Sequence, residues 1–302
     1  PGFGTIYNPI SKVYSIYGST TGSTVTQTTI YNYTVTTSGT CAAQTEVGDI
    51  TIVPIASLDV TSVSSTLNQT ICDGDNITPI TFDFGGSATN ASGLGLPLGV
   101  TLGPIVGNTI TISGPANVNV VTPTTYTFTV TATGNGTCEE ESFTGRIVVL
   151  PNDTLTHIAG DKNPTICNGN DPANPGITPI VYQLGGGATS GIVTGLPNGV
   201  SFTYSATTRQ LTIDGRPSLA IAVPTPFNYT VTTIGSCASQ TDSGIITVNP
   251  LSTISLSSAV STTSQIGADG ICMGDSIAEI FYTYGGGATS FSISGLPAGV
   301  QA

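Results

Sequence analysis

The sequence predicts an all-β protein made of tandem β-sandwich domains of about 100 residues, arranged end to end. Three observations lead to this prediction. The 302-residue chain has only 7% charged residues and contains 38 Gly, 19 Pro and no Trp. Its apolar residues occur in short runs rich in Thr, Val, Ile and Tyr, which favour strands over helices. Four short blocks also recur at a period of about 100 residues, which is too long for a solenoid unit and matches one small sandwich.

The repeat has a fixed internal order. It starts with a cysteine block, continues with a Gly-rich block ending in Gly-Leu-Pro-x-Gly-Val, then a Thr/Tyr strand followed by a second cysteine, and closes with a strand ending in Pro. The copies of these blocks are marked by Cys72, Cys167 and Cys272; by Gly95, Gly195 and Gly295; by Cys41, Cys138 and Cys237; and by Pro54, Pro151 and Pro250.

This order divides the chain into four parts. Residues 1–54 are the C-terminal part of a repeat, 55–151 and 152–250 are two complete repeats, and 251–302 are the N-terminal part of a fourth. We therefore expect the chain to be an excerpt from a longer protein.

Each complete repeat is expected to contain about seven strands. In the stretch YNYTVT, Tyr31, Tyr33 and Val35 alternate with polar residues, which is the pattern of a strand with one buried face. The equivalent stretches in the other repeats keep this face apolar. Earlier strands are expected at residues 76–84, 177–184 and 277–284, each followed by glycines, and further strands at 109–113 and 210–214.

The Gly-Leu-Pro-x-Gly-Val block is interpreted as a structural turn. With Pro at position i+1 and Gly at i+3, its residues fit a type I turn. The leucine before the proline is expected to enter the sandwich core; the three copies are Leu96, Leu196 and Leu296.

The succession GLPNGVSF, QLTIDGRPS, TPFNYTVTTIGSC and GIITVNP resembles the Ig-like, dystroglycan-type cadherin-like repeats of bacterial surface proteins. With its added cysteines, the repeat is similar to those of the giant surface adhesins of Bacteroidetes, such as gliding-motility adhesins secreted by the type IX system. The resemblance covers essentially the whole chain and implies tandem Ig-like β-sandwich domains. It also implies cell adhesion, a secreted protein and a bacterial cell-surface location.

The acidic calcium ligands of true cadherin junctions are not evident between these repeats, so no cofactor or metal is assigned. Asp73 and Asp75 in CDGDN are of the type that ligates a hard cation such as calcium. The equivalent positions in the second copy are Asn, however. A plain Gly-Asp/Asn turn is therefore the favoured interpretation.

The six cysteines occupy fixed places in the repeat, lack zinc spacing and form no Cys-x-x-Cys redox motif, so disulfides in an oxidising compartment explain them best. If the two cysteines of one repeat lie at opposite ends of the sandwich, they are too far apart to bond. The alternatives are then a bridge to a neighbouring unit, such as Cys72 to Cys237, or free thiols. Counting within repeats pairs Cys72 with Cys138 and Cys167 with Cys237, and leaves Cys41 and Cys272 unpaired by truncation.

Composition argues against several function classes. The net charge of −12 opposes binding to nucleic acid and to anionic membranes, and no apolar run is long enough for membrane insertion. His157 is the single histidine, so a Ser-His-Asp arrangement can occur at most once in an array whose units otherwise match. We therefore expect no catalytic residues and no enzyme.

The leading hypothesis is a structural stalk or spacer segment of a long secreted adhesin or filament. The alternative is an adhesive module that recognises a glycan or a protein through loops between strands. Expected partners are neighbouring Ig-like repeats, further copies of the chain in a fibre, and surface glycans or proteins. The family resemblance also suggests O-glycosylation at Thr154 and Ser276, which follow aspartates and precede aliphatic residues.

Overall fold

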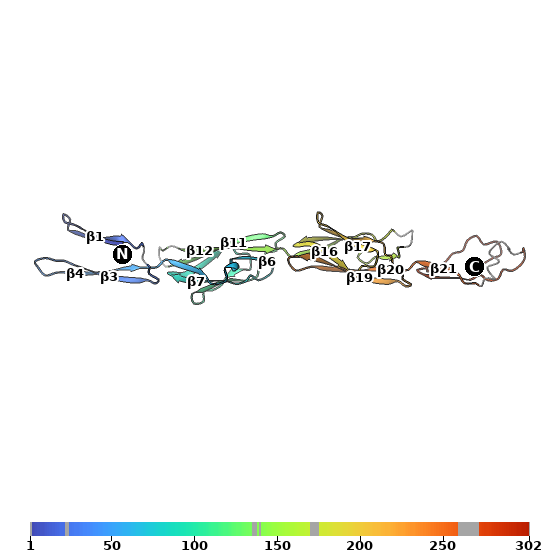
Figure 1. Ribbon diagram of the computed structural model, residues 1–302, viewed down its shortest axis with the longest axis horizontal. Helices are drawn as coiled ribbons and strands as arrows, with labels where there is room; N and C mark the ends of the chain where they lie inside the picture. The colour runs from blue at the N-terminus through green and yellow to red at the C-terminus, as the bar shows by residue number, and fades with distance from the viewer. Residues whose placement is uncertain are drawn as a thin grey trace. The chain divides into compact units, whose positions relative to one another are not determined.

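The computed structural model describes residues 2–21, 24–134, 138, 140–169, 175–258 and 272–301. The chain divides into two units, Pro1–Pro151 (unit 1) and Asn152–Ala302 (unit 2), and Figure 1 labels some of the strands of each. The only helical element among the described residues is the 3-10 helix η1 (Ser64–Leu67). The predicted all-β class is confirmed.

The described residues of unit 1 form twelve strands. They are β1 (Gly2–Asn8), β2 (Val13–Ser19), β3 (Thr29–Thr36), β4 (Thr45–Ile52), β5 (Ala56–Val60), β6 (Asn68–Cys72), β7 (Ile80–Gly86), β8 (Ala88–Leu94), β9 (Thr101–Leu102), β10 (Thr109–Ser113), β11 (Thr124–Gly134) and β12 (Glu141–Leu150).

Unit 2 contains ten strands among its described residues. They are β13 (Asp153–Ala159), β14 (Thr165–Cys167), β15 (Ile180–Gly186), β16 (Ala188–Thr194), β17 (Val200–Ser205), β18 (Gln210–Gly215), β19 (Thr225–Gly235), β20 (Thr241–Asn249), β21 (Ser252–Leu256) and β22 (Tyr282–Gly286).

Residues 55–151 form a sandwich of two four-stranded sheets, ordered β5-β7-β10-β9 and β6-β12-β11-β8. Residues 152–250 repeat this topology as β13-β15-β18-β17 and β14-β20-β19-β16. The described residues of each repeat thus form eight strands, where about seven were expected. In the first repeat, one of the eight, β9, has only two residues. In both repeats all pairs are antiparallel except the pairing of β6 with β12 and of β14 with β20, which is parallel.

Alternating side chains from both sheets form one core in each repeat. In the first, Phe82 and Ile112 meet Phe128 and Ile147 from the opposite sheet, and all four are completely buried. The second repeat has an equivalent core. The alternation in the sequence therefore predicts the buried face of these strands correctly, because successive side chains of a strand point to opposite faces.

The turn in Gly-Leu-Pro-x-Gly-Val lies one residue later than predicted. The amide of Val100 donates to the carbonyl oxygen of Pro97 at 3.0 Å, so Pro97 is position i and not i+1. Gly99 is then position i+2, and its φ of +91° fits a type II turn and not a type I turn. The fourth residue of the block, Leu98 in this copy, varies freely because it occupies position i+1, where φ is negative. Leu96 and Leu196 pack against the cores, as predicted, whereas the prediction is wrong for Leu296, which is 44% exposed.

Candidate functional site

The cysteines do not bond as counted within repeats. Cys72 and Cys237 are disulfide-bonded, whereas Cys138 has a free thiol. The predicted bridge between Cys72 and Cys138 is therefore not formed. Cys41 and Cys272 have exposed free thiols.

The register of the strands explains why a bridge within one repeat cannot form. Cys72 pairs with Leu150 at the end of β12, while Cys138 precedes the start of that strand at Glu141. A ten-residue strand spans about 33 Å, which greatly exceeds the roughly 7 Å limit between bridged Cα atoms.

The second repeat has the same arrangement. Cys167 pairs with Asn249 at the end of β20, and Cys237 precedes the start of this strand at Thr241. The predicted pairing of Cys167 with Cys237 is therefore also wrong.

The acidic turn after Cys72 has a structural role. The amide of Asp75 donates to the carbonyl oxygen of Cys72 at 3.0 Å, with Gly74 at a φ of +91° between them. The Asp73 carboxylate accepts hydrogen bonds from the amides of Val118 at 2.9 Å and Val120 at 3.2 Å. This carboxylate therefore holds the connection between β10 and β11 against the start of the repeat.

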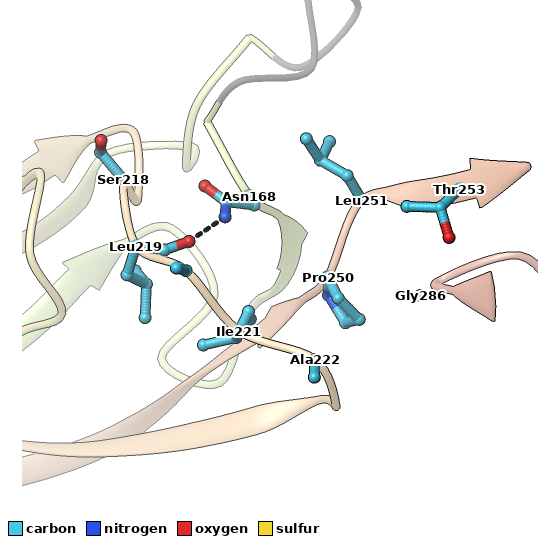
Figure 2. A pocket seen from close by; sticks show the side chains of 10 residues that line it. Asn168, Ser218, Leu219, Ile221, Ala222, Pro250, Leu251, Thr253 and Gly286 are labelled. Carbon is cyan, nitrogen blue, oxygen red and sulfur yellow. Dashed lines mark hydrogen bonds between the residues drawn. The ribbon is translucent and has the colours of Figure 1, made fainter. Parts of the chain in front are cut away.

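Asn168 occupies the position of Asp73 in the second repeat and reverses the polarity of this contact. Its amide nitrogen Nδ2 donates to the carbonyl oxygen of Leu219, as Figure 2 shows. Its oxygen Oδ1 accepts no hydrogen bond from the described residues although the side chain is only 5% exposed. Leaving a buried acceptor unpaired costs free energy. A hydrogen-bond donor that reached Asn168 Oδ1 would therefore be bound favourably.

Asn168 also lines an open cavity of about 610 Å³ in unit 2 (Figure 2). The walls of this cavity come from the segment between β18 and β19, from the residues after β20, and from the first residues of β21. Its lining includes Leu219, Ile221, Pro250 and Leu251, with Ser218 and Asn168 as polar groups. An apolar wall with a buried acceptor is an arrangement that can hold a small ligand or a peptide side chain.

A polar cluster in the sandwich of residues 152–250 runs from the buried Tyr182 and Tyr229 to the partly exposed pair Lys162 and Asp242. The hydroxyl groups of Tyr182 and Tyr229 are 3.4 Å apart, and Tyr229 donates to the carbonyl oxygen of Lys162 at 3.1 Å. The ammonium group of Lys162 forms an ion pair with Asp242 at 2.6 Å. The ring of His157 meets that of Tyr182 edge-on, with 5.3 Å between the ring centroids.

The electrostatics of this cluster keep both phenols protonated. Burial raises the pKa of Tyr182 far above its usual value, and the hydrogen bond with Tyr229 raises it further. Burial also raises the pKa of Tyr229. Burial acts to raise the pKa of Asp242, but the hydrogen bonds from the Lys162 ammonium and the Ser243 amide, together with the positive charge of Lys162, outweigh it, and the net pKa is lowered. The cluster therefore supplies no phenolate as a base near neutral pH.

The first repeat fills the same positions with apolar side chains. Phe82 occupies the position of Tyr182 and Phe143 that of Asp242, and their ring centroids lie 6.0 Å apart. Phe128 occupies the position of Tyr229. Equivalent positions in the two sandwiches are thus filled by apolar side chains in one repeat and by hydrogen-bonded polar side chains in the other. This indicates a structural role for the polar cluster.

The two expected glycosylation positions are accessible. Thr154 is exposed on β13, which lies at the edge of its sheet. Ser276 is exposed in the segment between β21 and β22.

The buried acceptor of Asn168 and the contact between Tyr182 and Tyr229 were not predicted from the sequence. A sequence signal existed for both, because Asn168 replaces Asp73 and Tyr182 replaces Phe82 at equivalent repeat positions. What the sequence could not supply was the distance between side chains more than 40 residues apart, such as Tyr182 and Tyr229.

Comparison with known proteins adds several structural similarities. No family model matches the chain, and no curated protein gives a significant match. Among solved structures, the I-band fragment I67-I69 from titin is 12% identical, with a TM-score of 0.41 and 67% of each chain covered. Protocadherin Gamma B7 extracellular cadherin domains 1-4 are 13% identical, with a TM-score of 0.41. The match covers 82% of this chain but 64% of the protocadherin chain, which is less than two thirds of that chain's length. The extracellular domain of Protocadherin GammaB4 is 9% identical, with a TM-score of 0.42 and coverages of 84% and 44%.

Proposed function

We propose that the chain is a stalk or spacer segment of a long secreted cell-surface adhesin or filament. The observation that carries this proposal is the closed core of each complete repeat. Residues 55–151 and 152–250 each bury an apolar cluster between two four-stranded sheets. Each repeat is therefore stabilised by its own contacts, as a bead in a load-bearing array must be.

The strand order supports a mechanical role. In each repeat an early strand pairs in parallel with the last strand, through five residue pairs between β6 and β12 and three between β14 and β20. Force applied to the two ends of a repeat pulls parallel neighbours in opposite directions. Their hydrogen bonds then bear the load together instead of opening one after another.

Single-molecule force spectroscopy tests this function. Each repeat is expected to unfold in a discrete event that releases about 300 Å of chain, since an extended residue spans about 3.5 Å. The substitution Thr70→Pro removes an amide from β6 and is expected to lower the force of one event and leave the other unchanged. Smooth extension without discrete events would contradict the stalk function.

The proposed location is extracellular, at a bacterial cell surface. The bonded state of Cys72 and Cys237 supports an oxidising compartment. Among the described residues, the structure has no helix long and apolar enough to cross a membrane. The resemblance to Bacteroidetes adhesins is the basis for proposing gliding motility and type IX secretion.

Non-reducing peptide mapping of the native protein tests the compartment and the connectivity together. We expect Cys72 and Cys237 in disulfide-linked peptides and no peptide that joins Cys72 to Cys138. Free thiols at all positions would remove the argument for an oxidising compartment.

An adhesive module is the second candidate, and the cavity beside Asn168 is the observation that favours it. Binding of a surface glycan in this cavity would be weakened by Asn168→Ala, since the buried Oδ1 acceptor is lost. The control Thr203→Ala lies on β17, outside the cavity. A glycan array on which both variants bind as the native chain does would exclude this cavity as the site.

O-glycosylation at Thr154 and Ser276 is a further part of the proposed surface location. Intact-mass analysis of native material would reveal added hexose, and Thr154→Ala would remove one modification. A mass that equals the sequence mass would refute this proposal.

A further inference from the structure

One sheet of the second complete repeat ends on a long, uncharged edge strand. In the sheet order β13-β15-β18-β17, the last strand β17 pairs with β18 alone among the strands that the structure describes. The six residues of β17, VSFTYS, include no charged residue, no proline and no glycine. An edge strand of this kind presents a row of amide and carbonyl groups with which another strand can pair.

Each of the other edge strands in the two complete repeats carries a feature that hinders such pairing. β5 and β13 contain Asp59 and Asp153, and β9 and β14 have only two and three residues. The pairing of β8 and that of β16 each include a register shift. Beside β6, the side chain of Gln69 accepts from the amide of Thr78 at 2.7 Å and donates to its carbonyl oxygen at 2.8 Å. β17 is therefore the edge strand without a protecting feature.

The equivalent strand of the first repeat shows how this edge is closed when it is not used. β9 is followed by Gly103 and Pro104. Proline has no amide to donate and glycine weakens a strand, so the edge stops there. In the second repeat Thr203 and Tyr204 occupy these positions, and β17 pairs with β18 over its whole length without a register shift.

The hydrogen bonds to β18 decide which backbone groups of β17 face the open edge. In the first repeat, the amide of Gly103 donates to the carbonyl oxygen of Thr111 at 2.8 Å. Thr203 and Thr212 are the equivalent pair in the second repeat. Successive residues of an antiparallel strand direct their backbone groups to opposite sides. By this equivalence, the backbone groups of Phe202 and of the residues two positions to either side of it face away from β18.

We propose that β17 pairs in antiparallel orientation with β17 of a second copy of the chain, so that two four-stranded sheets join into one. Pairing centred on Phe202 places this residue opposite itself and places Val200 opposite Tyr204. All residues whose backbone groups face the edge then take part. The same register keeps the two faces of the sheet in order, because it places the exposed Ser201 opposite the exposed Thr203.

A second copy fits this edge because the strand is complementary to itself. The chain has a net charge of −12, yet pairing two β17 strands brings no like charges opposite each other. The cross-strand pairs are aromatic with aromatic, aromatic with β-branched, and serine with threonine, which are favourable combinations. A twofold contact of this type is isologous, so the association ends at a dimer.

This inference rests on the proposed stalk function only for the setting in which chains lie side by side. Force spectroscopy measures the unfolding of single chains and does not involve pairing between copies. Loss of the dimer and loss of discrete unfolding events are therefore separate outcomes, and either proposal can fail alone.

Analytical ultracentrifugation of the full chain tests the pairing, with exposed thiols alkylated by iodoacetamide so that they cannot cross-link copies. The parent is expected to pass from monomer to dimer as its concentration rises. A lysine variant carries Ser201→Lys and Thr203→Lys, and a glutamate variant carries Ser201→Glu and Thr203→Glu. In the proposed register each variant places like charges directly opposite each other, so each is expected to associate at least about tenfold more weakly than the parent.

A matched control places the same charges on another part of the repeat. Asn228→Lys and Thr230→Lys together add two lysines at the same spacing, at exposed positions of β19 in the opposite sheet. This control is expected to associate as the parent does. Equal loss of association in the control and in the lysine variant would show that net charge governs association, and would overturn the proposal.

Mixing the lysine and glutamate variants tests the register itself. In the mixed dimer each lysine lies opposite a glutamate, so an equimolar mixture is expected to form one-to-one dimers at least as tight as those of the parent. Recovery of the dimer also demonstrates that β17 is folded in both variants. A mixture that stays monomeric, a lysine variant that associates as strongly as the parent, or a parent that is monomeric at all concentrations would contradict the proposed pairing.

Discussion

Removing the aromatic side chain at one repeat position is expected to lower the stability strongly in one repeat and only slightly in another. Tyr229 is completely buried, and its hydroxyl donates to the carbonyl oxygen of Lys162 at 3.1 Å. Tyr33 occupies the equivalent position in residues 1–54 and is 38% exposed. The substitutions Tyr229→Ala and Tyr33→Ala therefore make the same chemical change in a covered and an uncovered sheet face.

The structure sets the magnitude for Tyr229→Ala. Deleting a buried aromatic side chain costs about 3–5 kcal/mol of unfolding free energy, and the lost hydrogen bond adds about 1 kcal/mol. A domain of this size has a total of only about 5–15 kcal/mol. Since each kcal/mol shifts the melting temperature of such a domain by about 4–8 °C, the repeat should melt at least about 16 °C lower. Tyr33→Ala should change stability by less than about 1 kcal/mol.

Differential scanning calorimetry of the full chain provides the measurement. Phe128→Ala identifies the transition of the first complete repeat, because Phe128 is the completely buried counterpart of Tyr229 there. Tyr229→Ala should shift the other transition. Equal effects of Tyr229→Ala and Tyr33→Ala would refute the assignment of which sheet faces are covered.

Two further predictions concern charge and backbone conformation. The hydrogen bond from Lys162 holds the pKa of Asp242 below its usual 3.8, so the stability that Asp242 contributes is present above pH 3.8 and is lost as the pH falls through the lower folded-state value. Asp242→Asn should therefore flatten the acid limb of a denaturation curve measured against pH, and an unchanged limb would contradict this. Gly186 has a φ of +56°, and a Cβ there would lie 1.9 Å from the carbonyl oxygen of Asn152. The left-handed conformation alone costs an alanine about 1–2 kcal/mol. Gly186→Ala should therefore lower the free energy of unfolding, obtained from the urea midpoint, by more than this amount. Gly39→Ala, with open space around the added Cβ, should change the midpoint little.

The sequence by itself determined the repeat, and it determined the strands of the two complete repeats together with the face that these strands bury. Tyr31, Tyr33 and Val35 recur as Phe227, Tyr229 and Val231, and the last two of these are completely buried in the complete repeat. This information is local, because alternation along a strand assigns its faces without reference to distant residues.

Only the tertiary structure decided the cysteine bonding, the turn and the role of Asp73. The register of β6 on β12 places Cys72 and Cys138 at opposite ends of a strand, although their order in the repeat suggested a pair. Likewise, Asp73 meets the amide of Val118, 45 residues away. Spacing along a chain does not specify distance in space, since the register of non-local strand pairs intervenes, and those pairs exist only once the sandwich has formed.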